Sequence, residues 1–208
     1  MEHTLLAIFI GYNSTNLLGC ENDAILFYKK LDIKNKFLLL NKQVNLENLE
    51  KILTYHKDQI LNNYKEPINI FIFYSGHGYL NGDLCFHKKK VKALEIYELI
   101  NKNFINKVNL FVILDCCHSG NFPCIKNFQQ INNVSIIASS TNYEISTESL
   151  VNFDFNNKIN KLYFGAFTYN LVKLLNKYKN VDIISIINDN EIWKKLELIM
   201  KKKISIIK

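Results

Sequence analysis

The chain contains no arginine, and all 26 of its basic residues are lysines. It has only two prolines and seven glycines in 208 residues, while 48% of its residues are hydrophobic. A chain of this length and composition can bury a real core, which excludes a largely disordered protein. Linkers rich in Gly, Ser or Pro and internal repeats are also missing, so a single domain over residues 1–208 is the simplest account.

Long hydrophobic runs and a secretion leader are absent as well. No apolar run approaches the length of a membrane span, and the first ten residues have neither a basic leader nor a small-residue cleavage site. The five cysteines form an odd set without the spacing of a disulfide framework. We therefore expect free thiols in a reducing compartment, a cytoplasmic location and no membrane partner.

The net charge of +7 raises the question of nucleic-acid binding. The lysines are dispersed, apart from runs at Lys88 to Lys90 and Lys201 to Lys203, and no aromatic stacking motif accompanies either run. Both runs are typical of a solvated face, so no nucleic-acid partner is expected. Salt-dependent retention on DNA or RNA would test the opposite hypothesis.

Apolar and helical segments alternate along the chain. Continuous runs rich in Ile, Val, Leu and Phe predict strands buried on both faces, at residues 5–10, 37–40, 68–74, 110–114 and 134–138. Helical spacing occupies residues 24–31, 46–61 with Asn45 as the N-cap, 93–100, 166–178 and a stretch ending in 191–200. This alternation predicts an α/β fold with a mainly parallel sheet. Residues 204–207 suit a sixth, edge strand, and the Asn-rich residues 151–162 are predicted to form a surface loop.

Two polar motifs directly follow buried strands. Ser75-Gly76-His77-Gly78 follows the third strand, and Asp115-Cys116-Cys117-His118-Ser119-Gly120 follows the fourth. The carboxyl ends of neighbouring parallel strands open into one crevice, where such folds bind ligands. We therefore expect His77 and Cys117 to meet there.

A histidine and a cysteine in one crevice suit nucleophilic catalysis. A thiol with a pKa of roughly 8.5 is mostly protonated at neutral pH, so a nearby imidazole is needed to take its proton. The glycines of both motifs let the backbone come close to a substrate. Amide groups at Gly78 and Cys117 can then form an oxyanion hole.

Two other interpretations of these residues stay open at this point. A lone His or Cys at a strand end is more often structural than catalytic. A zinc site is also conceivable, because Cys116, Cys117, His118 and Cys124 lie close together in the sequence. Against zinc, adjacent cysteines on an extended chain point to opposite sides, and no second C-x-x-C pair exists.

The two motifs together resemble the histidine and cysteine motifs of caspase-like peptidases, specifically the metacaspase branch. Further similar segments are Leu18 to Ala24, Ser135 to Ser140 and Gly165-Ala166-Phe167-Thr168. The resemblance implies a caspase-like three-layer sandwich with a six-stranded sheet, divided into a large-subunit-like region (1–130) and a small-subunit-like region (131–208). It also implies that His77 is the base and Cys117 the nucleophile, with Cys116 and His118 as bystanders.

The same resemblance implies where the substrate side chain binds. It assigns Cys20, Asp23, Ser75 and Asp115 to the primary specificity pocket. Caspases proper cleave after aspartate and bind it with arginines, which this chain lacks. Two carboxylates in a partly desolvated cleft favour a cation, so cleavage after lysine or arginine is expected. The structural alternative is that Asp23 caps a helix and Asp115 supports the cysteine loop.

The sequence departs from the metacaspase pattern in its acidic residues. Many metacaspases bind calcium beyond the histidine loop, but here residues 79–93 offer only Asp83 among four lysines, and the downstream acidic position falls on Cys124. We expect no metal site and no cofactor. The predicted protein is a monomeric cysteine endopeptidase whose partners are peptides or proteins with basic residues. The alternative is a catalytically weak caspase-fold protein that acts by binding a partner.

Overall fold

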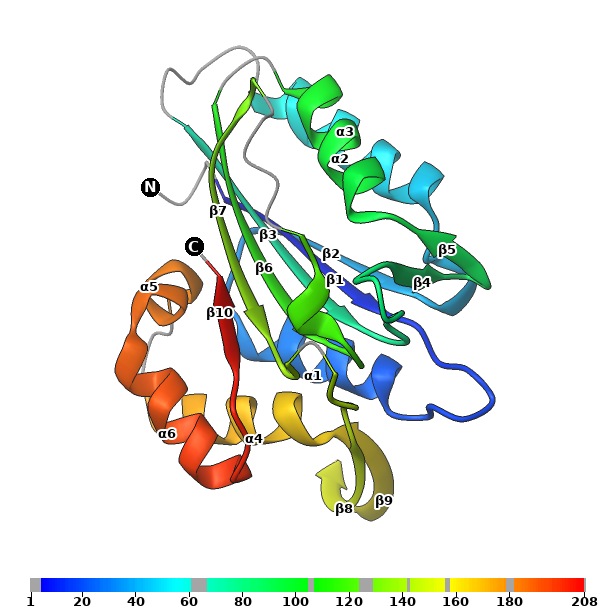
Figure 1. Cartoon of the computed structure of the whole chain (residues 1–208), viewed down its shortest axis with the longest axis vertical. Coiled ribbons are helices and arrows are strands. Elements are labelled where there is room, and N and C mark those ends of the chain that lie inside the picture. Colours follow the sequence, from blue (N-terminus) through cyan, green and yellow to red (C-terminus); the bar gives the residue numbers. More distant parts are fainter. Residues whose placement is uncertain are drawn as a thin grey trace.

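A six-stranded sheet forms the centre of the molecule (Figure 1). The structure is a computed structural model and describes residues 5–60, 67–104, 107–123, 129–141, 143–155, 158–178 and 182–207. The strand order is β10-β7-β6-β3-β1-β2, in which β10 alone runs antiparallel. The strands are β1 (Leu5–Gly11), β2 (Asn35–Leu40), β3 (Ile68–Ser75), β6 (Val108–Asp115), β7 (Ile131–Ala138) and β10 (Ser205–Ile207). The predicted α/β class and the sixth edge strand are confirmed.

Helices cover both faces of this sheet and make a three-layer sandwich. One face carries α2 (Leu46–Ile60) and α3 (Ala93–Asn103). The other carries α1 (Cys20–Lys30), α4 (Ala166–Leu175), α5 (Ile183–Asn188) and α6 (Asn190–Met200). Asn45 caps α2 as predicted, with Oδ1 accepting from the Asn48 amide at 2.8 Å.

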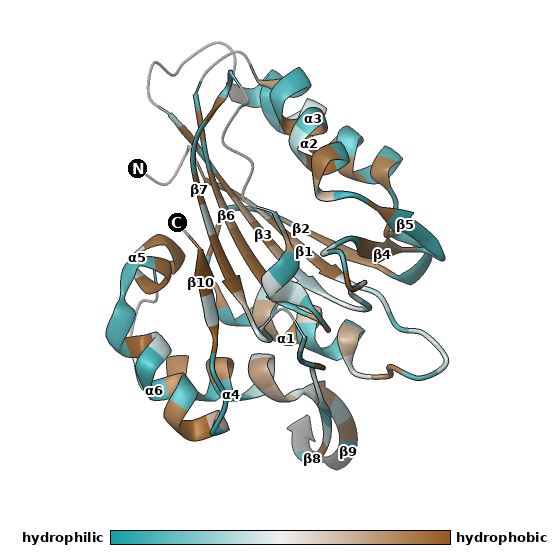
Figure 2. Cartoon of the chain, in the orientation of Figure 1, coloured by the Kyte–Doolittle hydropathy of each residue, from teal (hydrophilic) through white to brown (hydrophobic). Residues whose placement is uncertain are grey.

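The central strands are apolar on both sides because each side has its own core. In β3, Ile70 and Ile72 pack into the core under α2 and α3, whereas Phe71 and Phe73 pack into the core under α1 and α4. This alternation follows from the pleat, which sends successive side chains to opposite faces. Figure 2 shows the result as brown strands between two-toned helices. The continuous apolar runs of the sequence therefore correspond to strands that are buried on both faces.

Two hairpins lie outside the central sheet. One pairs β4 (Leu84–Phe86) with β5 (Lys89–Val91), and the other pairs β8 (Glu148–Phe155) with β9 (Lys158–Gly165). The second hairpin corrects the prediction of a surface loop at residues 151–162. That prediction was wrong because a two-stranded ribbon outside the core needs no buried run, and Leu150 and Tyr163 are indeed exposed.

Candidate active site

The two polar motifs lie side by side because their strands are neighbours. β3 and β6 pair in parallel with Ser75 opposite Asp115, so His77 and Cys117 each follow two residues after the paired ends. The loops touch at Gly78, where an added Cβ would overlap the carbonyl oxygen of Cys117 and come within 2.9 Å of the Cys116 sulfur. Only glycine allows this approach.

The backbone of the histidine loop is held from below by Tyr74. Its hydroxyl, fully buried, lies 2.9 Å from the carbonyl oxygen of His77 and 3.0 Å from that of Cys85. The Cys85 amide also donates to the His77 carbonyl at 3.1 Å. These bonds fix the position of the His77 backbone, from which the imidazole extends.

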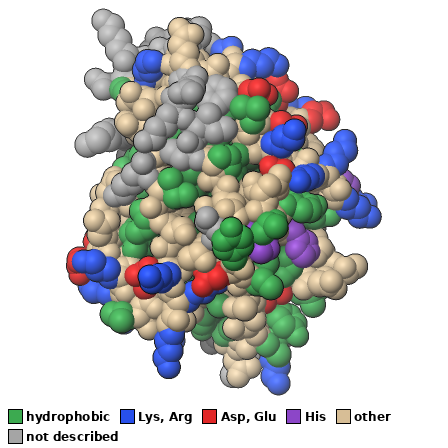
Figure 3. Space-filling model, viewed as in Figure 1, with side chains coloured by type: hydrophobic (Ala, Val, Ile, Leu, Met, Phe, Trp, Pro, Cys, Tyr) green, Lys and Arg blue, Asp and Glu red, His purple; other side chains and the backbone are tan. Residues whose placement is uncertain are grey.

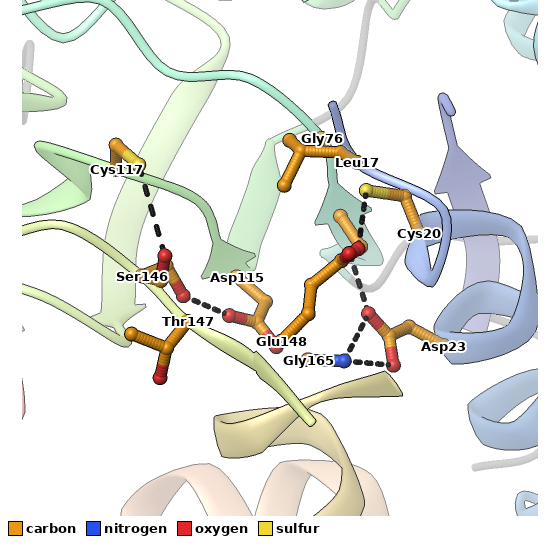
Figure 4. Close-up of a pocket in the computed structure, with 11 residues that line it drawn as sticks. Leu17, Cys20, Asp23, Gly76, Asp115, Cys117, Ser146, Thr147, Glu148 and Gly165 are labelled. Carbon is orange, nitrogen blue, oxygen red and sulfur yellow. Dashed lines mark hydrogen bonds between the residues drawn. The ribbon is translucent and has the colours of Figure 1, made fainter. Parts of the chain in front are cut away.

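The side chains of His77 and Cys117 bond to different partners. His77 Nε2 lies 2.6 Å from Ser14 Oγ, in the loop between β1 and α1. Cys117 Sγ lies 3.9 Å from the carbonyl oxygen of Ser146, as Figure 4 shows. Among the described residues, no hydrogen bond joins the imidazole to the thiol. The fold thus brings the two loops together and leaves the pair itself unbonded.

The two adjacent cysteines face opposite sides. Cys116 is 1% exposed and packs in the apolar core, and burial, with the nearby Asp115 charge, raises the pKa of its thiol. Its carbonyl accepts from Ser140 Oγ at 3.0 Å, which ties the loop to the end of β7. Cys117 is half-buried and lines the neighbouring pocket. This divergence does not suit a shared metal, and Cys124 lies outside the described residues.

A pocket opens beside Cys117 and contains the four predicted binding residues (Figure 4). Its walls come from the β1–α1 loop, α1, the ends of β3 and β6, the segment that leads into β8, and the start of α4. The lining residues are Leu17, Cys20, Asp23, Ser75, Gly76, Asp115, Cys117, Ser146, Thr147, Glu148 and Gly165. The binding role of Cys20, Asp23, Ser75 and Asp115 stays a prediction, but their position beside the thiol is a feature of the fold.

Asp23 is fully buried at the base of this pocket. Its carboxylate accepts from Ser75 Oγ at 2.8 Å and from the Gly165 amide at 2.9 Å. Burial and the nearby charge of Asp115 raise the pKa of Asp23 well above its ordinary value, against the opposing effect of these hydrogen bonds. Asp23 does not cap α1, whose N-cap is Gly19 without a side-chain bond.

Asp115 joins the pocket to the N-terminus of α4. Its Oδ2 accepts from the amide and the hydroxyl of Thr168 at 3.0 and 2.7 Å, and its Oδ1 accepts from Ser146 Oγ at 2.6 Å. The carboxylate thus satisfies a helix-end amide and interacts favourably with the helix dipole. Gly165 lies between Asp23 and Asp115, where a Cβ would overlap Asp115 Oδ2.

A third carboxylate, which sequence reasoning missed, belongs to Glu148 at the start of β8. It accepts from the amides of Gly19 at 2.7 Å and Leu18 at 3.1 Å, and Cys20 Sγ lies 3.8 Å away. Burial, followed by the charge of Asp23, raises the pKa of Cys20. No strand-end motif marks Glu148, since it precedes a segment that looked like a loop. Ser14 and Ser146 also lie outside any recognisable motif in the sequence and were missed.

The acidic residue expected near a calcium site is already engaged. Asp83 is 5% exposed, and its carboxylate pairs with Lys90 at 3.1 Å and accepts from Asn81 at 2.7 Å. Within the described residues, no three His, Cys, Asp or Glu side chains converge in a way that could hold a metal ion. The described helices also include none that is long and apolar enough to cross a membrane.

Comparison with known proteins identifies the family. A family model described as the caspase domain matches residues 4–203, which is nearly the whole chain. A comparison with curated proteins found no match. The matched span includes both polar motifs, five of the six sheet strands and every residue of the pocket, and it ends just before β10. This chain belongs to the caspase-domain family of cysteine peptidases.

Proposed function

We propose that the protein is a cysteine endopeptidase of the metacaspase type that cleaves after lysine or arginine. The observation that carries this proposal is the pocket beside Cys117, which is lined by three carboxylates and, among the described residues, by no basic side chain. In the proposed reaction His77 is the base and Cys117 the nucleophile. The peptidase class follows from the family; the dyad and the basic specificity are the added claims.

The proposed chemistry uses both touching loops. His77 takes the proton of Cys117, and the thiolate sulfur attacks the carbonyl carbon of the scissile bond. The amides of Gly78 and Cys117 donate to the oxyanion, a role supported by the close contact of their loops. The imidazolium then protonates the leaving amine, and water hydrolyses the thioester to release the acid and restore the thiol.

This chemistry requires the Cys117 side chain to move from its position in the free protein. His77 is bonded to Ser14 and Cys117 to the Ser146 carbonyl. Catalytic hydrogen bonds are often absent or long before substrate binds, so this geometry is compatible with a dyad. A rotation of the Cys117 side chain away from the 3.9 Å contact is a small change, because sulfur bonds at this length are weak.

The pocket favours a cation for electrostatic reasons. Asp23 is buried next to Asp115, and its pKa is raised first by burial and then by repulsion from the Asp115 charge. A lysine or arginine side chain of the substrate offsets that repulsion, whereas an aspartate adds to it and is excluded. Arginine should bind better than lysine where two carboxylates receive its planar fork.

The remaining expectations become part of the same proposal. We infer that the enzyme works as a monomer in the cytoplasm, needs no cofactor or calcium, and binds neither nucleic acid nor membrane. The engaged Asp83 supports the claim on calcium. On the face seen in Figure 3, lysines are interspersed with acidic side chains around a mostly uncharged centre, which supports the claim on nucleic acid.

A second function is favoured by the same unbonded dyad. If Cys117 keeps its contact with the Ser146 carbonyl when a peptide arrives, the protein would bind basic segments without cutting them. The two functions predict different results for Cys117→Ala. The variant would bind basic segments in either case, but it would keep the cellular effect of the protein only if that effect comes from binding.

A positional peptide library, with and without calcium, tests the first proposal. We expect cleavage after Lys and Arg, none after Asp, and rates that change less than about twofold on chelation.

Glu148→Gln should raise KM for lysine substrates about tenfold, since a hydrogen bond to a charged group contributes about 1.5 to 3 kcal/mol and this site is only half-buried. Glu98→Gln, an exposed site on α3, is the matched control. Equal cleavage after Lys, Arg and Asp would refute the pocket assignment.

A further inference from the structure

Ser14 makes a short side-chain contact with the histidine of the dyad. Its Oγ lies 2.6 Å from His77 Nε2, although the residues are 63 positions apart in the chain. Within the described part of the chain, this is the only hydrogen bond of the His77 ring, and Nδ1 has no hydrogen-bond partner. The imidazole is therefore held at one nitrogen and left open at the other.

The loop that carries Ser14 is tied down on both sides. The amide of Ser14 donates to the Leu17 carbonyl at 2.9 Å, which closes a tight turn. Just before it, Asn13 Oδ1 accepts from the Glu21 amide of α1 at 3.0 Å, and the Tyr12 amide donates to the Ser75 carbonyl at 3.0 Å. Since Ser75 ends the strand that leads to His77, the hydroxyl and the ring are anchored to the same strand end.

We propose that Ser14 is the positioning residue of the His77 base: its hydroxyl accepts the Nε2 proton and so presents an unprotonated Nδ1 to Cys117. This inference rests on the proposed function and adds a specific nitrogen to it. A neutral imidazole has one donor and one acceptor nitrogen, so fixing the proton on one fixes the lone pair on the other.

The proton balance follows from this arrangement. The Cys117 proton moves to Nδ1, and the resulting imidazolium keeps its second proton on Nε2, where Ser14 Oγ accepts it. The Nδ1 proton then moves to the leaving amine as the carbon–nitrogen bond breaks. Ser14 neither gains nor loses a proton in the cycle.

The test compares Ser14→Ala with Ser14→Thr and a control at Thr15. Removing the hydroxyl should lower kcat about 10- to 100-fold with KM within about twofold, a part of the 10²- to 10⁴-fold that a positioned base supplies. Threonine keeps the hydroxyl and should restore most of the rate. Thr15→Ala changes an exposed neighbour in the same turn and should match the wild type. An unchanged or higher kcat in Ser14→Ala would overturn the proposal, and the higher value would mark the contact as a latch that holds the base back.

A spectroscopic readout separates this inference from the proposed function. In the wild type, 15N spectra of the histidines should show His77 as the Nε2-protonated tautomer, assigned by its loss in His77→Gln. Ser14→Ala should yield a mixture of tautomers, whereas an Nδ1-protonated wild type would overturn the proposal. This measurement needs no turnover, so an enzyme that cleaved nothing would refute the function and still decide the role of Ser14.

Discussion

At the scale of single residues, two neighbouring cysteines have opposite surroundings. Cys117→Ala should abolish peptide cleavage, because Cys117 lines the pocket beside the histidine loop. Cys116→Ala should keep most of it, because that thiol is buried in the core with a raised pKa. Initial rates on a lysine peptide, together with labelling by iodoacetamide, measure both. Comparable losses in the two variants would contradict the assignment.

Asp23 predicts a particular dependence of stability on pH. Its pKa is raised in the folded protein, so the folded state holds the proton more tightly than the unfolded chain. Its contribution is therefore fully present below the ordinary carboxyl pKa and is lost as pH rises through the raised value. The free energy of unfolding of Asp23→Asn minus that of the wild type should therefore increase as pH rises across this window, by at most about 1.4 kcal/mol per pH unit. Urea titrations at several pH values measure it, and parallel curves would refute it.

Single residues also show where prediction from sequence stops. His77 and Cys117 could be found because each follows a buried strand with a recognisable motif, and β3 and β6 are neighbours in the sheet. Ser14 and Glu148 could not be found in this way. Their side chains contact residues 63 and about 130 positions away, and such contacts exist only once the chain has folded.

At the scale of secondary structure, the burial of a strand or helix decides whether it can be predicted from the sequence. The four inner strands, β7, β6, β3 and β1, are apolar on both faces, so their continuous runs are distinctive. The β8–β9 hairpin has exposed apolar residues and many asparagines, which resemble a loop, although its backbone pairs from Glu148 to Gly165. The short α5 was missed because its six residues merge with α6 in the hydrophobic pattern, and only the caps at Asp182 and Asp189 divide them.

The junction of β9 and α4 should tolerate no side chain at Gly165. A Cβ there would overlap Asp115 Oδ2 and come within 2.8 Å of Asp23 Oδ2, which also accepts the Gly165 amide. Gly165→Ala should therefore lose about 1 to 3 kcal/mol of stability and raise KM for basic peptides. Ser149→Ala, at an exposed site of the same hairpin, is the control for both measurements. A fully stable, fully active Gly165→Ala enzyme would contradict this geometry.

At the scale of the whole molecule, the pocket needs both regions of the chain. Asp23 and Ser75 come from the first region, whereas Glu148 and Gly165 come from the second. Gly19 and Glu148 are joined directly by a 2.7 Å bond, so the two regions meet without any cut between them. We therefore expect the intact chain to be active as folded.

Self-cleavage, where it occurs, should follow lysine. The first three lysines after Cys117 in the sequence are Lys126, Lys158 and Lys161. Lys126 lies outside the described residues, the side chain of Lys158 is not described, and Lys161 is exposed in β9 opposite Asn152. Because a paired strand must open before it can enter an active site, cleavage after Lys161 should be slow. Mass spectrometry of aged enzyme should find any cut after lysine while fresh, uncut enzyme already turns over. Activity that rises only with a cut would refute this view.

The order in which the pocket residues are synthesised has a consequence inside the cell. Cys117 leaves the ribosome well before Glu148, Gly165 and Thr168. These three residues bond to pocket groups made earlier: Glu148 to the Leu18 amide, Gly165 to the Asp23 carboxylate and Thr168 to the Asp115 carboxylate. A nascent chain that ends before Thr168 therefore carries a thiol without a finished pocket. We therefore expect a chain released before Thr168 to have no peptidase activity, so that an unfinished enzyme does not cleave the ribosome that makes it.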